Sequence, residues 1–179
     1  MRNLKQIMLF VMVGSLLTFT SCSKDDDNSG SGGAVGSGTM TADIDGAGFK
    51  NFKDLGQATV ADLGGQGKTL TIQSSNSDGQ SINIVIWNYT GEGTYKIDSS
   101  GLNSNTGIYT ETDVSNPTDP NSTNIWSAPY ENSAEESVII TKETDSNIEG
   151  EFSFKGKNAK DSSVKDVANG KFNLSRMDV

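Results

Sequence analysis

The stretch at positions 148–155 reads Ile-Glu-Gly-Glu-Phe-Ser-Phe-Lys, in which apolar or small residues alternate with polar ones. Successive side chains of a β-strand point to opposite faces of a sheet. This period of two places Ile148, Phe152 and Phe154 on one face and leaves Glu149 and Glu151 on the other. The stretch therefore predicts a strand with one side in a core and the other in water.

The same alternation recurs toward both ends of the chain, for example in the row Ile82, Ile84 and Ile86. Turn-forming pairs such as Asp45-Gly46 separate the alternating runs, which is typical of hairpins. No segment has a helical period with caps. We expect about ten strands, at 40–44, 57–62, 68–75, 80–88, 93–98, 107–112, 124–128, 136–144, 147–157 and 166–175. The predicted fold class is all-β, a single antiparallel β-sandwich or meandering β-barrel over residues 39–179.

Residues 1–21 have the parts of a secretory signal peptide, namely a basic start with Arg2 and Lys5, an apolar run and small residues before a cut site. The apolar run is shorter than the about 20 residues that a membrane-spanning helix needs. The next residue, Cys22, is the only cysteine of the chain. With the small pair Thr20-Ser21 it resembles the lipobox of bacterial lipoproteins, with Phe19 where leucine is usual. We therefore expect cleavage before Cys22 and acylation of this cysteine, which anchors the chain in a membrane.

Residues 22–38 form an acidic and then Gly/Ser-rich segment, whose composition is typical of a flexible linker. Its beginning, with Lys24, Asp25, Asp26 and Asp27, resembles the surface-export signal of Bacteroidota lipoproteins. This resemblance implies a lipid-anchored protein of the outer membrane, displayed on the cell surface. A charged, solvated tether is the alternative interpretation of the same residues.

Composition argues against several classes of function. A formal net charge of −9 argues against nucleic-acid binding, which needs basic groups to neutralise phosphates. The chain has no histidine, so it lacks both the usual base of catalytic triads and the commonest zinc ligand. With Cys22 acylated, no thiol remains for a disulfide or a metal. We predict no catalytic residues, no cofactor and no metal.

Aromatic side chains are the first group of candidate binding residues, because flat rings stack on the faces of sugars. The candidates are Trp87, Tyr89, Trp126 and Tyr130, followed by Tyr95 and Tyr109. Trp87 lies opposite the isoleucine row and is expected to point away from the core. The alternative for every one of these rings is packing across the sheet.

Oxygen ligands for calcium are a second group, at Asp113, Asn116, Asp119 and Asn121. Their spacing fits no EF-hand. Turn formation by Asn, Asp and Pro explains these residues without a metal.

Five short phrases occur in order along the chain and carry a family resemblance. They are the segments 40–46, 70–73, 89–95, 150–154 and 169–172. With the leader, they resemble an uncharacterised family of Bacteroidota lipoproteins, a domain of unknown function that opens with a Thr-Ala-x-Ile-Asp-Gly strand. The resemblance covers residues 40–174, implies the all-β fold and the cell-envelope address, and brings no catalytic residues.

The expected function is that of a non-catalytic binding domain for a glycan or another envelope component, such as an envelope protein. One alternative is a calycin-like barrel that holds a small apolar ligand, which would leave a cavity among Ile84, Ile86, Phe152 and Phe154. Another alternative is an accessory subunit of an outer-membrane protein complex, which would expose an apolar patch.

Overall fold

A computed structural model describes residues 35–99, 104–119, 121–130 and 136–179 of the chain. These residues form eleven strands and one 3₁₀ turn at Gly64–Gln66. The strands are β1 Thr39–Ile44, β2 Ala47–Lys50, β3 Gln57–Asp62, β4 Lys68–Ser75, β5 Gln80–Trp87, β6 Gly93–Lys96, β7 Thr106–Thr112, β8 Thr123–Ala128, β9 Ser137–Glu143, β10 Asn147–Asn158 and β11 Val164–Asp178. The predicted all-β fold is confirmed. No helix among the described residues has the length and apolarity to cross a bilayer.

The strands pair in the order β2-β1-β11-β3-β4-β5-β7-β8-β10-β9-β6. An additional pairing of β10 with β11 closes seven of them into a ring, formed by β11, β3, β4, β5, β7, β8 and β10. Neighbours run antiparallel, as expected, except β11 and β3, which run parallel from Ser175 opposite Gln57 to Asp178 opposite Val60. Ring closure therefore depends on a contact between the C-terminal strand and a strand near the start of the domain.

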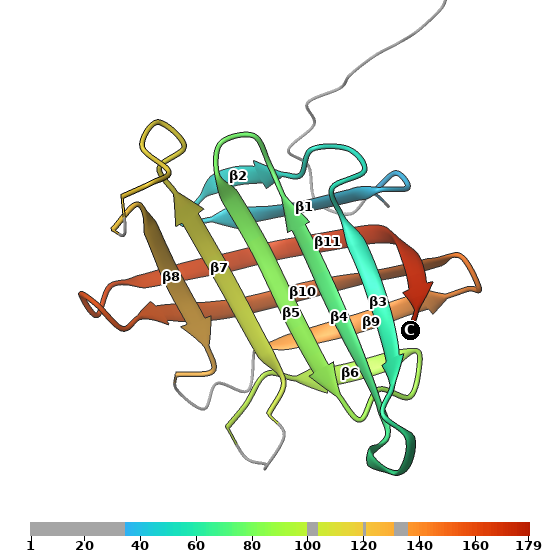
Figure 1. Cartoon of the computed structure of the whole chain (residues 1–179). Coiled ribbons are helices and arrows are strands. Elements are labelled where there is room, and N and C mark those ends of the chain that lie inside the picture. Colours follow the sequence, from blue (N-terminus) through green and yellow to red (C-terminus); the bar gives the residue numbers. More distant parts are fainter. Residues whose placement is uncertain (1–34, 100–103, 120, 131–135) are drawn as a thin grey trace, which may run out of the picture. The chain divides into compact units, whose positions relative to one another are not determined.

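The ring is flattened into two layers. Figure 1 shows β3, β4, β5, β7 and β8 side by side in one layer, crossing over β1, β11, β10, β9 and β6 in the other. The two layers are joined at one side by the β11–β3 pairing and at the other by β8 and β10, where Ser127 lies opposite Lys157. The arrangement resembles a β-sandwich whose two sheets are continuous.

The space between the layers is filled by side chains. The four residues at which an interior cavity would lie, Ile84, Ile86, Phe152 and Phe154, are at most 4% exposed. The rings of Phe152 and Phe154 stack with centroids 6.4 Å apart. A Cβ added at Gly107 would lie 2.7 Å from the Phe154 ring, because the ring packs directly on the backbone of β7. The aromatic rings thus occupy the volume that glycine leaves free.

Strand β2 is the one element that the sequence did not predict. It follows a turn at Asp45 and Gly46, whose φ values of 50° and 83° fit the type I′ hairpin turn that an Asp-Gly pair favours. Only Phe49 of its four residues is buried, so the segment has no alternation to detect. Pairing with β1, from Thr41 opposite Lys50, holds β2 in place.

Candidate functional site

The four aromatic candidates do not lie on one surface. Tyr89 and Trp126 are buried, with 4% and 5% of their surface exposed, whereas Trp87 and Tyr130 are partly exposed. Tyr130 follows β8 and lies near Lys157, whose Nζ is 6.0 Å from the ring centroid. Only Trp87 stands on a continuous strand surface with a face open to solvent.

Trp126 has a structural role. Its ring packs against Tyr109 with centroids 5.7 Å apart, and its Nε1 donates a hydrogen bond of 2.9 Å to Ser163 Oγ. The Lys165 ammonium lies 5.5 Å from its ring centroid, within the range of a cation–π contact. Each side of the indole therefore has a protein partner, and no face is left for a ligand.

Tyr89 is likewise part of the core. Its ring lies 5.7 Å from that of Tyr95, whose hydroxyl donates to the Gly91 carbonyl at 2.7 Å. Burial raises the pKa of the Tyr89 hydroxyl well above its usual range, and the nearby Glu143 carboxylate adds to the effect. The hydroxyl is therefore protonated at neutral pH.

Trp87 belongs to the outward face of the first layer, the surface of β3, β4, β5, β7 and β8 that points away from the core. No side chain on this face is charged. Its residues are Gln57, Thr59, Ala61, Thr69, Thr71, Gln73, Ser75, Ser81, Asn83, Val85, Trp87, Thr106, Ile108, Thr110, Thr112, Thr123, Ile125 and Ser127. The charged residues of these strands, Asp62, Lys68 and Glu111, fall in the alternation on the same side as the inward-facing positions and lie at the strand ends. We call this surface the neutral face.

The strand register aligns the neutral face into rows that cross the strands. One row runs Gln57, Gln73, Asn83, Ile108, Ser127 through all five strands. This row combines three amides and one hydroxyl, which both donate and accept hydrogen bonds, with the apolar side chain of Ile108.

Trp87 lies at one end of the neutral face, where its backbone is hydrogen-bonded to a side chain. Its cross-strand neighbour is Thr69, which is only 9% exposed. Its backbone N–H donates to Asn105 Oδ1 at 2.8 Å, and the Asn105 amide donates in turn to the Lys96 carbonyl at 2.8 Å. The indole therefore stands on a fixed backbone.

The outward face of the second layer is different in character, because ion pairs cross it. Lys142 pairs with Glu149 at 3.1 Å, and Lys171 approaches Glu151 at 3.9 Å. These residues face one another across β9, β10 and β11. The two outer surfaces of one domain thus divide into a charged one and an uncharged one.

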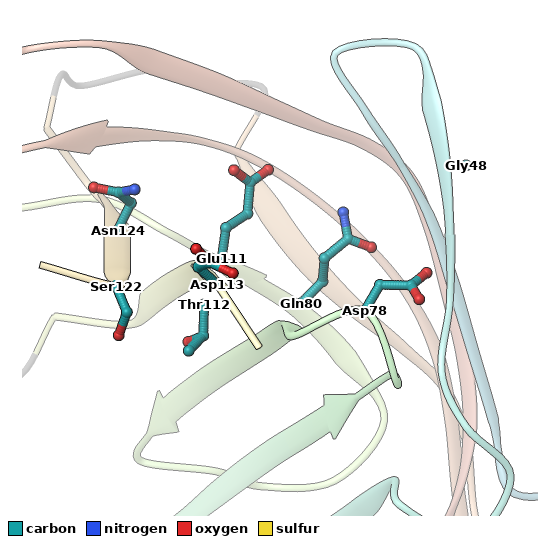
Figure 2. Close-up of a pocket in the computed structure, with 8 residues that line it drawn as sticks. All are labelled: Gly48, Asp78, Gln80, Glu111, Thr112, Asp113, Ser122 and Asn124. Atoms are coloured by element: carbon teal, nitrogen blue, oxygen red, sulfur yellow. The ribbon is translucent and has the colours of Figure 1, made fainter. Parts of the chain in front are cut away.

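A polar groove lies at the end of the inward-facing rows, between the β1–β2 hairpin and the β7–β8 loop (Figure 2). It has a volume of about 490 Å³. Its lining residues are Gly48, Asp78, Gln80, Glu111, Thr112, Asp113, Ser122 and Asn124. In Figure 2 the side chains of Gln80 and Glu111 point the same way, from neighbouring strands.

Hydrogen bonds and ion pairs hold much of this groove together. The Tyr109 hydroxyl donates to Glu111 Oε1 at 2.8 Å and accepts from Gln80 Nε2 at 2.9 Å. Lys165 lies 3.5 Å from the same Glu111 oxygen and 3.3 Å from Asp45 Oδ2. Glu111 Oε1 thus already has two partners, Tyr109 and Lys165. The polar residues that line the groove cover this end of the core.

The oxygen-rich residues of the β7–β8 loop are engaged in turns. Asp113 Oδ1 accepts from the Ser115 hydroxyl at 2.6 Å and from its backbone N–H at 2.9 Å, and these bonds lower the pKa of Asp113. Asp119 Oδ1 accepts from the Asn121 N–H at 2.8 Å. Within the described ranges, no three Asp, Glu, His or Cys side chains lie close enough together to hold a metal ion.

A scan against family models matches residues 38–174 with a domain of unknown function, DUF6252. The chain belongs to the DUF6252 family. Comparisons with curated proteins and with solved structures found no match. The DUF6252 assignment agrees with the resemblance to an uncharacterised family seen in the sequence, and it brings no site residues with it.

Other predicted sites lie outside the described residues. These are the lipidation site Cys22 and the export signal Lys24, Asp25, Asp26 and Asp27. The neutral face as a whole was not predicted from the sequence. Its signal was present, since the outward positions of strands 57–62, 68–75 and 80–87 carry no charged residue, but recognising one surface required the strand pairing.

Proposed function

We propose that this chain is a lipoprotein of the Bacteroidota outer membrane whose DUF6252 domain is a non-catalytic module that binds glycan on the cell surface. The signal peptide, the lipobox-like segment ending in Cys22 and the acidic residues 25–27 support the address. Replacing Cys22 by alanine removes the acylation site, so the protein should leave the membrane fraction and become soluble. A Cys22→Ala protein that stays with the membranes would contradict the anchor.

The single observation that carries the binding role is the neutral face with Trp87. Sugars present hydroxyl groups at their edges and C–H groups on their faces, so they need hydrogen-bonding and apolar partners side by side. The neutral face supplies both, since Asn83 lies beside Ile108 and Thr69 lies beside Trp87. Tryptophan is a frequent anchor of binding interfaces, because it supplies a large contact area with only two rotatable side-chain bonds.

The test is a fluorescence titration of the full chain, purified in a non-ionic detergent, with a panel of polysaccharides. Trp87 and Trp126 are its two tryptophans, and only Trp87 is open to solvent. We expect a saturable change in emission that persists in the Trp126→Phe protein and disappears in the Trp87→Phe protein. A flat response of the folded wild type to every polysaccharide would refute the proposal.

A further inference from the structure

We infer that the ligand of the neutral face is an uncharged polysaccharide chain that lies extended across the strands. This inference rests on the proposed function and adds the chemical class and the orientation of the ligand. Two properties of the face carry it, namely its charge and the direction of its rows.

The charge of the face selects against acidic glycans. The chain carries a net charge of −9, and none of the residues of the face is a Lys or Arg that could pair with a uronate, sulfate or phosphate group. The Lys160 ammonium at the edge of the face donates to the Thr123 carbonyl at 2.9 Å. An anionic ligand would lose hydration on this surface without gaining a counter-charge. Asp78 and Asp113, which lie in the turns that follow β4 and β7, would repel it further. A neutral sugar meets neither penalty.

The rows of the face favour an extended ligand. Neighbouring strands lie about 4.8 Å apart, so the row from Gln57 to Ser127 extends roughly 19 Å over five strands. Its groups recur at intervals similar to the length of one sugar unit. The groove described above opens at the end of the inward-facing rows, and of its lining residues only Thr112 belongs to this face. A chain of several sugar units can therefore make repeated contacts along a row, whereas a single sugar would cover only a small part of the face.

The experiment is affinity gel electrophoresis of the full chain in a non-ionic detergent. The gels contain hydroxyethylcellulose or galactomannan as neutral polymers, and polygalacturonate or alginate as acidic ones. Thr71→Asp places a charge at the centre of the face, between Thr59 and Val85. Thr41→Asp is the matched control, since Thr41 is a partly exposed threonine of the opposite layer, next to Lys50 and Lys171. Trp87 lies four residues along β5 from Asn83 of the row, so the Trp87→Ala protein tests whether the polymer also reaches the edge of the face.

We expect a neutral polymer to slow the wild type and the Thr41→Asp protein equally, and the acidic polymers to slow neither. Thr71→Asp and Trp87→Ala should each weaken the retardation about tenfold, which corresponds to about 1.4 kcal/mol. Free glucose or mannose should not relieve it. Unfolding midpoints of all variants verify that a loss of retardation is not a loss of fold.

The outcomes separate the inference from the proposed function. Equal or stronger retardation by acidic polymers, or competition by monosaccharides, would overturn the inference and leave glycan binding in place. A similar loss for Thr41→Asp and Thr71→Asp would remove the neutral face from the interaction. A folded wild type that no polymer slows would overturn both. Wild-type dimers that Thr71→Asp dissociates would instead assign the face to a second copy of the chain.

Discussion

Replacing Gly107 by alanine tests whether the interior between the two layers is full. The new Cβ would meet three ring atoms of Phe154 at 2.7, 2.8 and 3.0 Å. The backbone of β7 has little room to yield, because Gly107 pairs with Ile84 of β5 on one side and Ala128 of β8 on the other. The ring is 1% exposed, so it would have to move into other core side chains. Overpacking of this kind costs about 1–3 kcal/mol.

The measurement is the unfolding midpoint of the full chain, followed by far-ultraviolet circular dichroism in a non-ionic detergent. For a chain of this size, a loss of 1–3 kcal/mol lowers the midpoint by roughly 2–12 °C. Gly48→Ala is the matched control, because a Cβ at Gly48 of β2 would have no heavy atom within 4 Å. Combining Gly107→Ala with Phe154→Leu should recover part of the loss, since the two sites are in contact.

The result also bears on the alternative of an apolar ligand inside the ring. A cavity large enough for such a ligand would let the Phe154 ring move aside. Gly107→Ala would then be no more damaging than Gly48→Ala. That outcome would refute the account of a filled interior and favour the calycin-like alternative over a binding face on the outside.

Two further predictions follow from named contacts. Trp126→Ala should lower the free energy of unfolding, measured in urea, by about 3–5 kcal/mol, because the indole is 5% exposed. Trp87→Ala should lower it by about 1 kcal/mol or less. Similar losses for the two variants would make Trp87 a core residue. The pKa of Asp45 is lowered chiefly by the backbone N–H of Asp166, 2.9 Å from Oδ1, and also by Lys165. The ionised Asp45 carboxylate therefore stabilises the fold above the unfolded-state pKa. This contribution is lost as the pH falls through the folded-state pKa. Asp45→Asn should therefore be less stable than the wild type at pH 7, with a difference that shrinks below about pH 4, and a constant difference in thermal midpoint between pH 7 and pH 3 would contradict this account.

Strand positions were largely predictable because the period of two is a local property. The stretch around Phe152 and Phe154 lies in β10 as expected, and all ten predicted strands correspond to observed ones. Strand β2 was not predicted because only one of its four residues is buried, which leaves no alternation of apolar and polar residues. The closure of the ring was not predictable either, since the pairing of β11 with β3 joins segments more than a hundred residues apart.

The candidate site shows where alternation stops being informative. In β8 the residues Ile125 and Trp126 are adjacent and both apolar, so the sequence leaves open which one is buried. The register with β7 decides the matter: Trp126 lies opposite Tyr109 in the core, and Ile125 lies opposite Thr110 with 48% of its surface exposed. Tyr89 follows the end of β5, where the period of that strand no longer applies, and its burial depends on contact with Tyr95.

The neutral face is hard to explain by stability alone. Outward strand positions tolerate charge in this fold, because the opposite layer carries Lys142, Glu149, Glu151 and Lys171 at equivalent positions. An uncharged sheet face with β-branched and aromatic residues is a liability, since it lacks the charged surface side chains that oppose association with other chains. The acidic residues of this chain would serve that purpose if they were spread over both faces. The absence of acidic residues from the neutral face suits a surface that binds an uncharged partner. Bound ligand would then cover the face and prevent its association with other chains.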